Sequence, residues 1–378
     1  MRGRFVDQAK LFSYISPEAR VPEQHPLRHI RELVREVLKQ LSWSFSRLYA
    51  SEGRPSVPPE QLLSALLLQV FYGIRSERQL IEQLNYNLLY RWFVGLSPDD
   101  PVWDATTFTK NRERLQGGDI FQKFMTKLLN LPEVKQLLSD EHFSVDGTLI
   151  EAWSSQKSFR PKDGSDGDGA DFHGQQRKND THASTTDPDC RLYRKSNGSE
   201  AKLAYMGHVV MENRHGLVVA GMVTQASGTA ERRASEEMLG ALREQIGHRI
   251  TAGADKAYDC AEHVAKLRAA GVTPHVARND AVTKTGKRRR SALDGRTTRH
   301  AGYRISQTRR AMLECVYGWG KQHGTMRKTK HPAFAGSRRL RAQSDWLQPD
   351  PDSEAACAGI GRVCTDDPTD DPDCSFRE

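Results

Sequence analysis

The sequence lacks any apolar run long enough to cross a membrane. Its longest candidate, LLSALLLQVFYGI at residues 62–74, falls short of the roughly 18–20 residues that a spanning helix needs, and Arg75 follows it. The opening residues, MRGRFVDQAK, lack the apolar centre of a signal peptide. The sequence therefore predicts a cytoplasmic protein with no membrane partner.

Paired cysteines are missing as well. The six cysteines are Cys190, Cys260, Cys315, Cys357, Cys364 and Cys374. None of them forms a CxxC pair, which argues against both a zinc module and a disulfide framework. We expect free thiols that are buried or incidental.

Acidic residues are the minority charge. The chain has 56 Lys and Arg against 48 Asp and Glu, a net charge of +8. Residues 351–378 hold eight acidic and two basic side chains, a net of −6, which leaves +14 for residues 1–350. A basic body favours an acidic polymer such as nucleic acid as partner, although many basic proteins bind none.

Residues 26–138 have a helical period almost throughout. Apolar residues recur at three- and four-residue spacing from Leu27 to Leu41, and residues 62–72, after Pro58 and Pro59, are apolar nearly all round. Further helices are expected at 77–84 with Ser76 as cap, at 88–94, and at 108–115 with Thr106 or Thr107 as cap.

A buried helix, a turn at Gly73 and a capped polar helix resemble a helix-turn-helix, but most helical hairpins bind nothing. The cations of this region that would meet DNA phosphate are Arg75, Arg78, Lys110, Arg112 and Arg114. Their alternative role is a solvated helix face, and the sequence leaves both open.

The pattern changes near residue 140 to alternating strands and helices. Strands are expected at 142–153, 203–212, 217–223, 250–258 and 273–277, and helices at 229–246, 261–269 and 306–324. The segment between them at 154–199 is polar and rich in Gly, Asp and Ser, so we expect a long loop or partly disordered insertion. The succession predicts a mixed α/β sheet.

Three acidic residues lie far apart in this sequence, each in a distinct context. Asp146 lies in the apolar run HFSVDGTLIEAW, Asp255 ends the strand in ITAGADKAYD, and Glu314 lies in the helical RRAMLECVYGWGK. Hard divalent cations take oxygen ligands, and two of them can clamp both oxygens of an in-line phosphodiester displacement. The trio indicates a two-metal site. Taken singly, Asp146 has a β-turn as its structural alternative, and Asp255 has a turn or a helix cap.

A helical wheel places Arg310, Glu314 and Lys321 within about 40° of one another. Apolar residues fall on the other side of the wheel: Met312, Leu313, Val316 and Trp319. A carboxylate between two cations could bind a metal ion while the cations hold phosphate, and a surface ion-pair stripe is the alternative.

Three segments together resemble the catalytic motifs of bacterial DDE transposases of insertion sequences, the IS-five-like group. They are SVDGT, ADKAYD and the pattern R-x3-E-x6-K, which runs from Arg310 through Glu314 to Lys321. The stretches THASTTDPDCRLYRKSNGSEAKLAYMGH and LDGRTTRHAGYRISQTRR are similar to segments of the same proteins, and the resemblance covers about residues 1–332. One local departure is Gln307, where the family has a tyrosine.

This resemblance implies an α/β ribonuclease-H-like catalytic core at 140–332, preceded by an all-α N-terminal domain at 1–138 that binds DNA ends. It implies that Asp146, Asp255 and Glu314 are catalytic and bind two Mg²⁺ (or Mn²⁺) ions per site, while Arg310 and Lys321 contact DNA phosphate. The implied reaction is cleavage of double-stranded DNA at terminal inverted repeats and strand transfer into target DNA. Synapsis of two ends implies a homo-oligomer, acting at the nucleoid in the bacterial cytoplasm.

The C-terminal segment departs more strongly from the family, which continues after Lys330 into an apolar helical tail. Residues 333–378 have no helical or strand period and accumulate Asp and Pro. We expect an irregular acidic tail. Our hypothesis is that the reading frame has shifted near residues 332–340 and that the tail is therefore non-native. Two alternatives to the transposase follow: a catalytically inactive remnant that still binds DNA, and a ribonuclease-H-like nuclease that cuts without joining.

Overall fold

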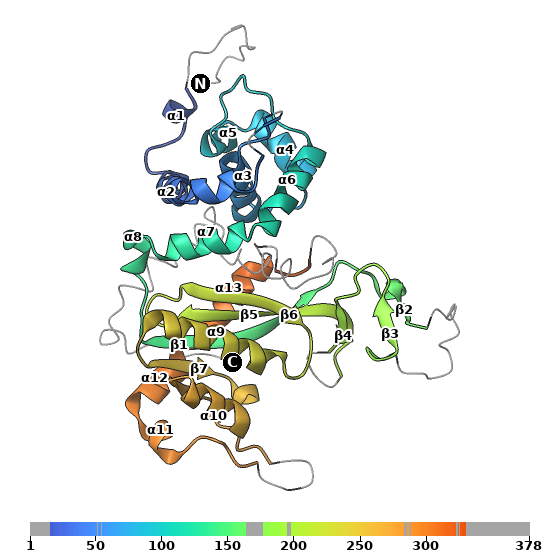
Figure 1. Cartoon of the computed structure of the whole chain (residues 1–378). Helices are drawn as coiled ribbons and strands as arrows, with labels where there is room; N and C mark the ends of the chain where they lie inside the picture. The colour runs from blue at the N-terminus through green and yellow to red at the C-terminus, as the bar shows by residue number, and fades with distance from the viewer. Residues whose placement is uncertain are drawn as a thin grey trace, which may run out of the picture. The chain divides into compact units, whose positions relative to one another are not determined.

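Figure 1 shows the computed structural model of the chain. It describes residues 16–50, 52–53, 55–163, 177–194, 198–282, 286, 289–322, 324 and 326–329. The chain divides into two compact units: residues up to 113 except 70–73, and residues 70–73 together with those from 114 onward. The predicted tail at 333–378 lies outside the described residues.

The first unit is helical, as predicted. Its helices are α1 (Pro17–Arg20), α2 (Pro26–Ser46), α3 (Pro59–Phe71), α4 (Glu77–Tyr86), α5 (Leu88–Val94) and most of α6 (Ala105–Gly117). The helix α2 buries one apolar stripe that includes Val34, Val37 and Leu41, which is what its period predicts. Residues 62–69 of α3 are all buried, in agreement with an apolar run that has no polar side.

The caps of these helices confirm one prediction and correct another. Ser76 caps α4, since its hydroxyl accepts a hydrogen bond from the backbone N–H of Gln79 (3.2 Å). The helix α6 is capped by Asp104 and not by Thr106 or Thr107: the Asp104 carboxylate accepts the backbone N–H groups of both threonines, at 2.8 and 3.1 Å. Their hydroxyls donate to it as well and lower the pKa of Asp104. A carboxylate satisfies more of the unpaired donors at a helix start than a hydroxyl can.

The second unit is built around a mixed sheet. It begins with α7 (Ile120–Leu129) and α8 (Pro132–Lys135), and its main strands are β1 (His142–Glu151), β5 (Lys202–Glu212), β6 (Val218–Gln225), β7 (Ile250–Ala254) and β8 (Val272–Val276). Across the sheet these strands follow the order β6-β5-β1-β7-β8. The pairs β1/β5 and β5/β6 are antiparallel, whereas β1/β7 and β7/β8 are parallel. A hairpin thus precedes two parallel strands, with β1 at the centre.

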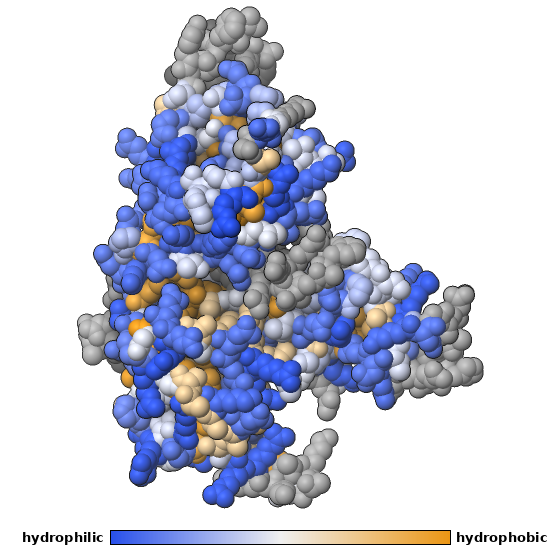
Figure 2. Space-filling view, viewed as in Figure 1, coloured by the Kyte–Doolittle hydropathy of each residue, from blue (hydrophilic) through white to orange (hydrophobic). Residues whose placement is uncertain are grey.

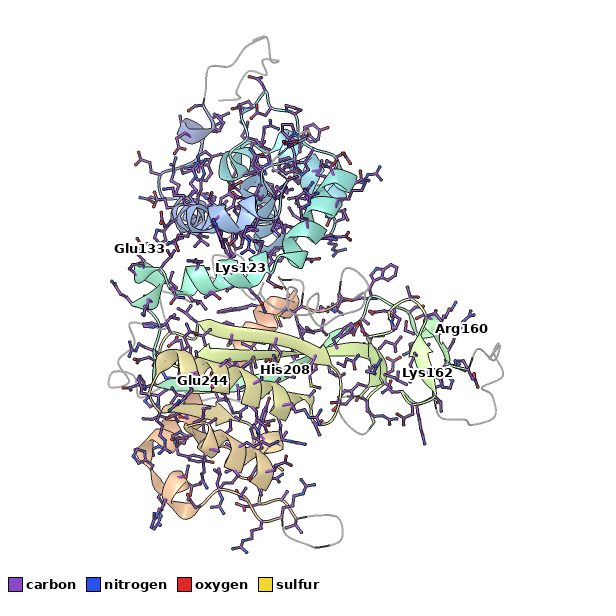
Figure 3. All side chains as sticks on the ribbon, in the orientation of Figure 1. Lys123, Glu133, Arg160, Lys162, His208 and Glu244 are labelled. Carbon is purple, nitrogen blue, oxygen red and sulfur yellow. The ribbon has the colours of Figure 1, made fainter. Side chains whose placement is uncertain are left out.

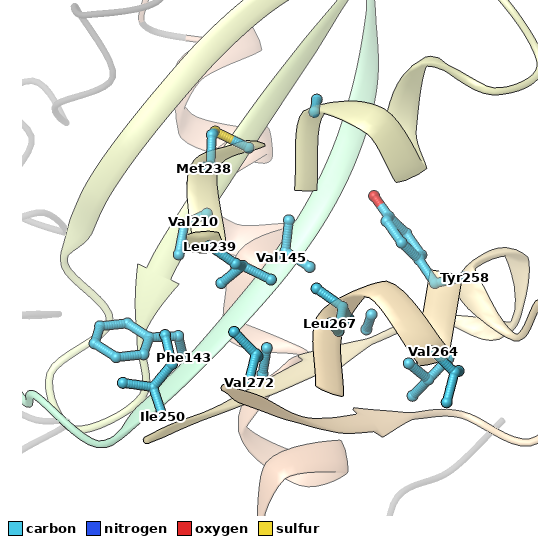
Figure 4. Packing of buried hydrophobic residues seen from close by; sticks show 14 of the residues in the cluster. Phe143, Val145, Val210, Met238, Leu239, Ile250, Tyr258, Val264, Leu267 and Val272 are labelled. Atoms are coloured by element: carbon cyan, nitrogen blue, oxygen red, sulfur yellow. The ribbon is translucent and has the colours of Figure 1, made fainter. Parts of the chain in front are cut away.

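Helices cover both faces of this sheet. The helices α9 (Ala230–Ile246) and α10 (Ala261–Ala269) cover one face, where Phe143 and Val145 of β1 pack with Leu239 and Leu267 (Figure 4). The helices α11 (Gly295–Arg299), α12 (Ala301–Arg309) and α13 (Met312–Gln322) follow β8. The side chains of α13 pack with Val209 and Met211 of β5. Since residues of a strand alternate between faces, odd-numbered residues of β1 face α9 and even-numbered ones face the other side.

The polar insertion at 154–199 contains more structure than its composition predicts. After a short 3-10 turn (Gln156–Ser158), β2 (Phe159–Pro161) pairs with β3 (His182–Ser184), and β4 (Arg191–Tyr193) joins β5 in the main sheet. The carboxylate of Asp187 is buried and accepts a hydrogen bond from the hydroxyl of Tyr205 (2.5 Å). The prediction of a long loop is wrong for these residues, because polar contacts replace the apolar period. Residues 164–176 lie outside the described residues.

The predicted last helix at 306–324 is also wrong in one respect. The chain turns at Arg310 and Ala311 between α12 and α13, and the N–H groups of Leu313 and Glu314 bond to carbonyls three residues back. Arg310 therefore does not share the wheel of Glu314 and Lys321. The sheet order, the paired crossover helices and the preceding helical unit confirm the predicted fold class, a ribonuclease-H-like α/β core after an all-α region.

Candidate active site

Asp146 lies in the middle of β1 and is half-buried. Its side-chain Oδ1 accepts a hydrogen bond from the backbone N–H of Gly147 (2.9 Å), and its carbonyl accepts one from the hydroxyl of Tyr317 (2.6 Å). Two residues along the same face, the hydroxyl of Thr148 receives a hydrogen bond from Nζ of Lys321 (2.5 Å). The helix α13 is thereby fixed over Asp146. The ammonium group of Lys321 is held at Thr148, two residues along β1 from the Asp146 carboxylate.

Asp255 comes directly after β7, which runs parallel to β1. The pairing of β1 with β7 ends at Ser144 and Gly253, so Asp146 and Asp255 each come two residues after the last paired position of neighbouring strands. Asp255 caps a short 3-10 turn (Lys256–Tyr258) through a hydrogen bond from the N–H of Ala257 to its Oδ1 (2.7 Å). The cap that was its structural alternative is therefore present, and it fixes the carboxylate at the carboxyl end of a parallel strand, where α/β sheets place their sites.

Glu314 lies in the first turn of α13 and is exposed. It shares the side of α13 that carries Lys321, as its spacing predicts. Among the described residues no group of three or more His, Cys, Asp or Glu side chains is close enough to hold a metal ion. The structure thus brings the two aspartates to neighbouring strands without gathering the trio into one ligand set.

Arg310 lies in the turn between α12 and α13. It is half-buried, and its Nε is buried without a hydrogen-bond partner in the described part of the chain. A buried guanidinium nitrogen without an acceptor is costly, so an oxygen of a ligand would stabilise it.

The five cations predicted to meet DNA phosphate differ in their surroundings. Arg75, Arg78, Lys110 and Arg114 are exposed. Arg112 instead forms an ion pair with Glu77, and both side chains are largely buried, at 13% and 10% exposure. Arg112 is therefore paired within its own unit, whereas the other four side chains are exposed to solvent. A role in DNA contact stays a prediction for all five.

A glutamate that the sequence analysis did not single out lies against β1. Glu231 is in the first turn of α9, and a β-carbon built on Gly147 would lie 2.8 Å from its Cγ and 2.9 Å from its Oε1. The only signal in the sequence is the glycine itself, since a glycine inside a strand often marks a close approach.

Tyr258 lies within the ADKAYD motif, although it was not among the predicted site residues. It is 0% exposed, and its hydroxyl has no hydrogen-bond partner among the described residues. Burial raises the pKa of Tyr258 well above its usual value, and the charges of Glu231, Asp146 and Asp255 add to this shift. The pKa of Tyr317 is raised by burial and then by Asp146 and Glu231. Both phenols therefore stay protonated as donors within the field of the same carboxylates.

Figure 2 shows where apolar residues reach the surface of the second unit. A shallow hollow of about 220 Å³ lies between β6 and α9, with Val219, Met222, Met238 and Leu242 in its wall. None of the predicted site residues lines it. This hollow is thus separate from the candidate site residues. No helix of the described residues is long and apolar enough to span a membrane.

A sheet in this order, with one carboxylate on β1 and another directly after β7, is the arrangement of a ribonuclease-H-like core. Sequence comparison agrees: residues 138–340 match the family described as Transposase DDE domain, and residues 15–114 match the family described as Transposase domain (DUF772). The chain belongs to the DDE-type transposases of insertion sequences.

Two solved structures align over most of the chain. A cryo-EM structure of a piggyBac transposase synaptic complex with hairpin DNA is 9% identical, with 90% of this chain and 80% of that chain covered and a TM-score of 0.40. A crystal structure of the Mos1 mariner paired end complex with Mn is 13% identical, with 91% and 95% covered and a TM-score of 0.21. At these scores neither alignment bears on the fold, and the family assignment rests on the sequence matches. No curated protein matches the chain.

Proposed function

We propose that the chain cleaves double-stranded DNA at the terminal inverted repeats of a mobile element and joins the freed ends to target DNA. The observation that carries the proposal is the placement of Asp146 on β1 and of Asp255 directly after the adjacent parallel strand β7 of a DDE-family core. Family membership supports transposition in general, and its chemistry would take place at these two residues.

Asp146 and Asp255 would hold divalent metal ions, Mg²⁺ or Mn²⁺, with Glu314 as the third ligand. Their carboxylate oxygens suit such hard cations, and the buried donors around them suit an oxygen-rich ligand. Two bound ions would supply the charge that stabilises the attacking and leaving oxygens of a phosphodiester displacement. Glu314 is exposed. We therefore expect its carboxylate to reach the bound metal ions only when DNA lies against α13.

The neighbouring cations would orient the DNA backbone. Lys321 donates a hydrogen bond to Thr148 on the strand of Asp146, and the buried Nε of Arg310 has no acceptor among the residues that the structure describes. Both would bind phosphate oxygens and offset the charge of the scissile strand. Neither needs to move a proton in this role.

End recognition would fall to residues 1–138 through the exposed Arg75, Arg78, Lys110 and Arg114. Phosphate contacts of this kind position DNA without reading its sequence, and they weaken as salt rises. Joining two element ends also requires that at least two protomers assemble on the DNA.

The direct test is nicking and joining of labelled DNA that carries the flanking inverted repeats, in Mg²⁺, by the wild type and by Asp146→Ala. We expect both products from the wild type and at least about a thousandfold less from the variant, since removing one member of a catalytic set removes most of the rate. Nicked but unjoined DNA from the wild type would identify a nuclease. Equal products from both proteins would contradict the proposal.

One observation favours a second candidate. Glu314 is exposed, and no ligand set of three gathers in the described residues. An inactive DNA-binding remnant would bind the inverted repeats yet give no product with Mg²⁺ or Mn²⁺ in either protein.

A further inference from the structure

We propose that six exposed arginines after β8 form a DNA-binding surface next to the candidate active site. The six, which we call the arginine surface, are Arg289, Arg290, Arg296, Arg299, Arg304 and Arg309. Their ligand would be the phosphate backbone of double-stranded DNA. This inference rests on the proposed function, because it gives the same substrate a further contact.

The positive charge of the chain is concentrated in the segment that holds these arginines. Residues 278–310 contain eleven Lys and Arg against two Asp, a net charge of +9, whereas the whole chain has +8. The remaining residues therefore sum to −1. A cluster of cations in one segment is typical of a surface that binds nucleic acid, since several phosphates have to be met together.

Carboxylates that could neutralise these arginines are few. The two aspartates of the segment pair with other arginines, Asp280 with Arg278 (3.2 Å) and Asp294 with Arg268 (3.3 Å). Within the part of the chain that the structure describes, no residue of the arginine surface forms an ion pair. An ion-paired surface is therefore not what this segment builds, and an anionic ligand would offset the mutual repulsion of the six charges.

The helices α11 and α12 carry four of the six arginines and lie side by side at one end of the second unit (Figure 1). The hydroxyls of Tyr303 and Ser306 hydrogen-bond to residues of β8, at 3.0 and 2.8 Å, and fix α12 to the sheet. Arg304 and Arg309 lie away from this contact and are exposed. The helix is thus held by one face, which gives both charges a rigid support.

The remaining two arginines lie in the loop between β8 and α11, and one carboxylate holds both ends of this loop. Asp259 accepts the backbone N–H of Asn279 through Oδ2 (2.7 Å) and that of Ala292 through Oδ1 (2.9 Å). Asp259 ends the same 3-10 turn that Asp255 begins. The loop is thereby anchored at the candidate active site, so DNA held at Asp255 would lie close to its arginines.

An acidic protein segment is the alternative ligand, because guanidinium groups bind carboxylates as well as phosphates. Duplex DNA carries about one negative charge per 1.7 Å of its length, so it can contact cations on a loop and on two helices at once. The anchor next to Asp255 also favours DNA, since the substrate of the proposed reaction has to reach that carboxylate.

The test is the affinity of the full chain for a labelled DNA duplex of unrelated sequence, measured by fluorescence anisotropy in EDTA over a range of salt concentrations. We expect Arg296→Ala combined with Arg304→Ala to bind at least about tenfold more weakly than the wild type in about 0.1 M salt. The slope of log affinity against log salt should become shallower by about 1.8, because each phosphate contact contributes about 0.9. Alanine is a good helix former, so the variant should fold, which its melting temperature checks.

The matched control removes two other exposed cations, Arg160 in β2 and Lys162 just after it (Figure 3). Arg160→Ala combined with Lys162→Ala lowers the net charge equally and should bind like the wild type. Equal losses in the two double variants would overturn the inference, because binding would then follow net charge alone. Unchanged duplex binding without Arg296 and Arg304 would overturn it as well, and weaker binding of a polyglutamate peptide by that variant would identify an acidic protein as the ligand.

These outcomes separate the arginine surface from the proposed function. Nicking that depends on Asp146, together with unchanged duplex binding in the absence of Arg296 and Arg304, would leave the function in place and remove only this surface. A wild type that binds no duplex would overturn both.

Asp259→Asn tests the anchor through the sign of its effect. The loss of a negative charge by itself would make the chain bind DNA more tightly. An amide has only one acceptor oxygen for the two N–H groups, so the loop would be released at one end and binding should weaken. Tighter binding would overturn the anchoring of the arginine surface by Asp259.

Discussion

Two helices approach β1 from opposite faces, and each carries a glutamate in its first turn. Glu314 of α13 is exposed, although its helix is tied to β1 by Tyr317 and Lys321. Glu231 of α9 is packed against Gly147, although no motif marks it. The comparison separates two kinds of information. Motif spacing along the chain identifies residues of the types that the reaction needs. A glycine in a central strand instead indicates that a side chain of a neighbouring helix lies close to that strand.

The largest effect is expected when Glu314 and Glu231 are each replaced by glutamine in separate variants. If Glu314 is the third catalytic ligand, Glu314→Gln should nick inverted-repeat DNA about a thousandfold more slowly than the wild type. Because the side chain is exposed, its melting temperature should stay within a degree or two of the wild type.

The outcome of this pair breaks or sharpens the comparison. Loss of nicking in both Glu314→Gln and Glu231→Gln would mean that the site draws on both faces of β1. Nicking that survives in Glu314→Gln and disappears in Glu231→Gln would place the third carboxylate on α9.

A smaller effect is expected from Gly147→Ala. The added methyl group would displace the carboxylate of Glu231, and we expect nicking to fall about ten- to a hundredfold, as when a residue that orients a metal ligand is altered. Stability should be unchanged or higher, because alanine restricts the unfolded chain more than glycine does.

The matched control is Gly240→Ala in α9, where a β-carbon meets nothing within 4 Å. This variant should be as active as the wild type and somewhat more stable. A Gly147→Ala enzyme with full activity would mean that the position of Glu231 does not matter to the reaction.

Much of the fold was predictable because its signals are local. The amphipathic period of α2, the Ser76 cap and the strand–helix alternation after residue 140 each depend on neighbours in sequence. The failures share a different cause. Asp104 caps α6 in place of the threonines that follow it. The insertion is ordered partly by the hydrogen bond between Tyr205 and Asp187, which are brought together only by folding.

The candidate site divides in the same way. The motifs pointed to Asp146 and Asp255, and parallel pairing explains why strand ends bring such residues together. The turn at Arg310 could not be foreseen, since no proline or glycine marks it, and it removes Arg310 from the wheel. Glu231 was missed because its contact depends on how α9 lies on the sheet, and sequence spacing carries no information about that.

The smallest expected effect concerns Tyr258, whose pKa is raised by burial and by the charges of carboxylates on both α9 and β1. Tyr258→Phe removes a buried donor without a partner, so the variant should be as stable as the wild type or more stable. Nicking should fall by up to about tenfold if the hydroxyl donates to a ligand.

Tyr303→Phe is the matched control, since that hydroxyl donates to the carbonyl of Val276 (3.0 Å) at the edge of the same core. Its loss should cost about 1 kcal/mol of stability and leave nicking unchanged. Opposite behaviour of the two variants, one losing activity and the other stability, would distinguish a hydroxyl that serves the ligand from one that serves the fold, whereas full activity in Tyr258→Phe would remove the hydroxyl from the site.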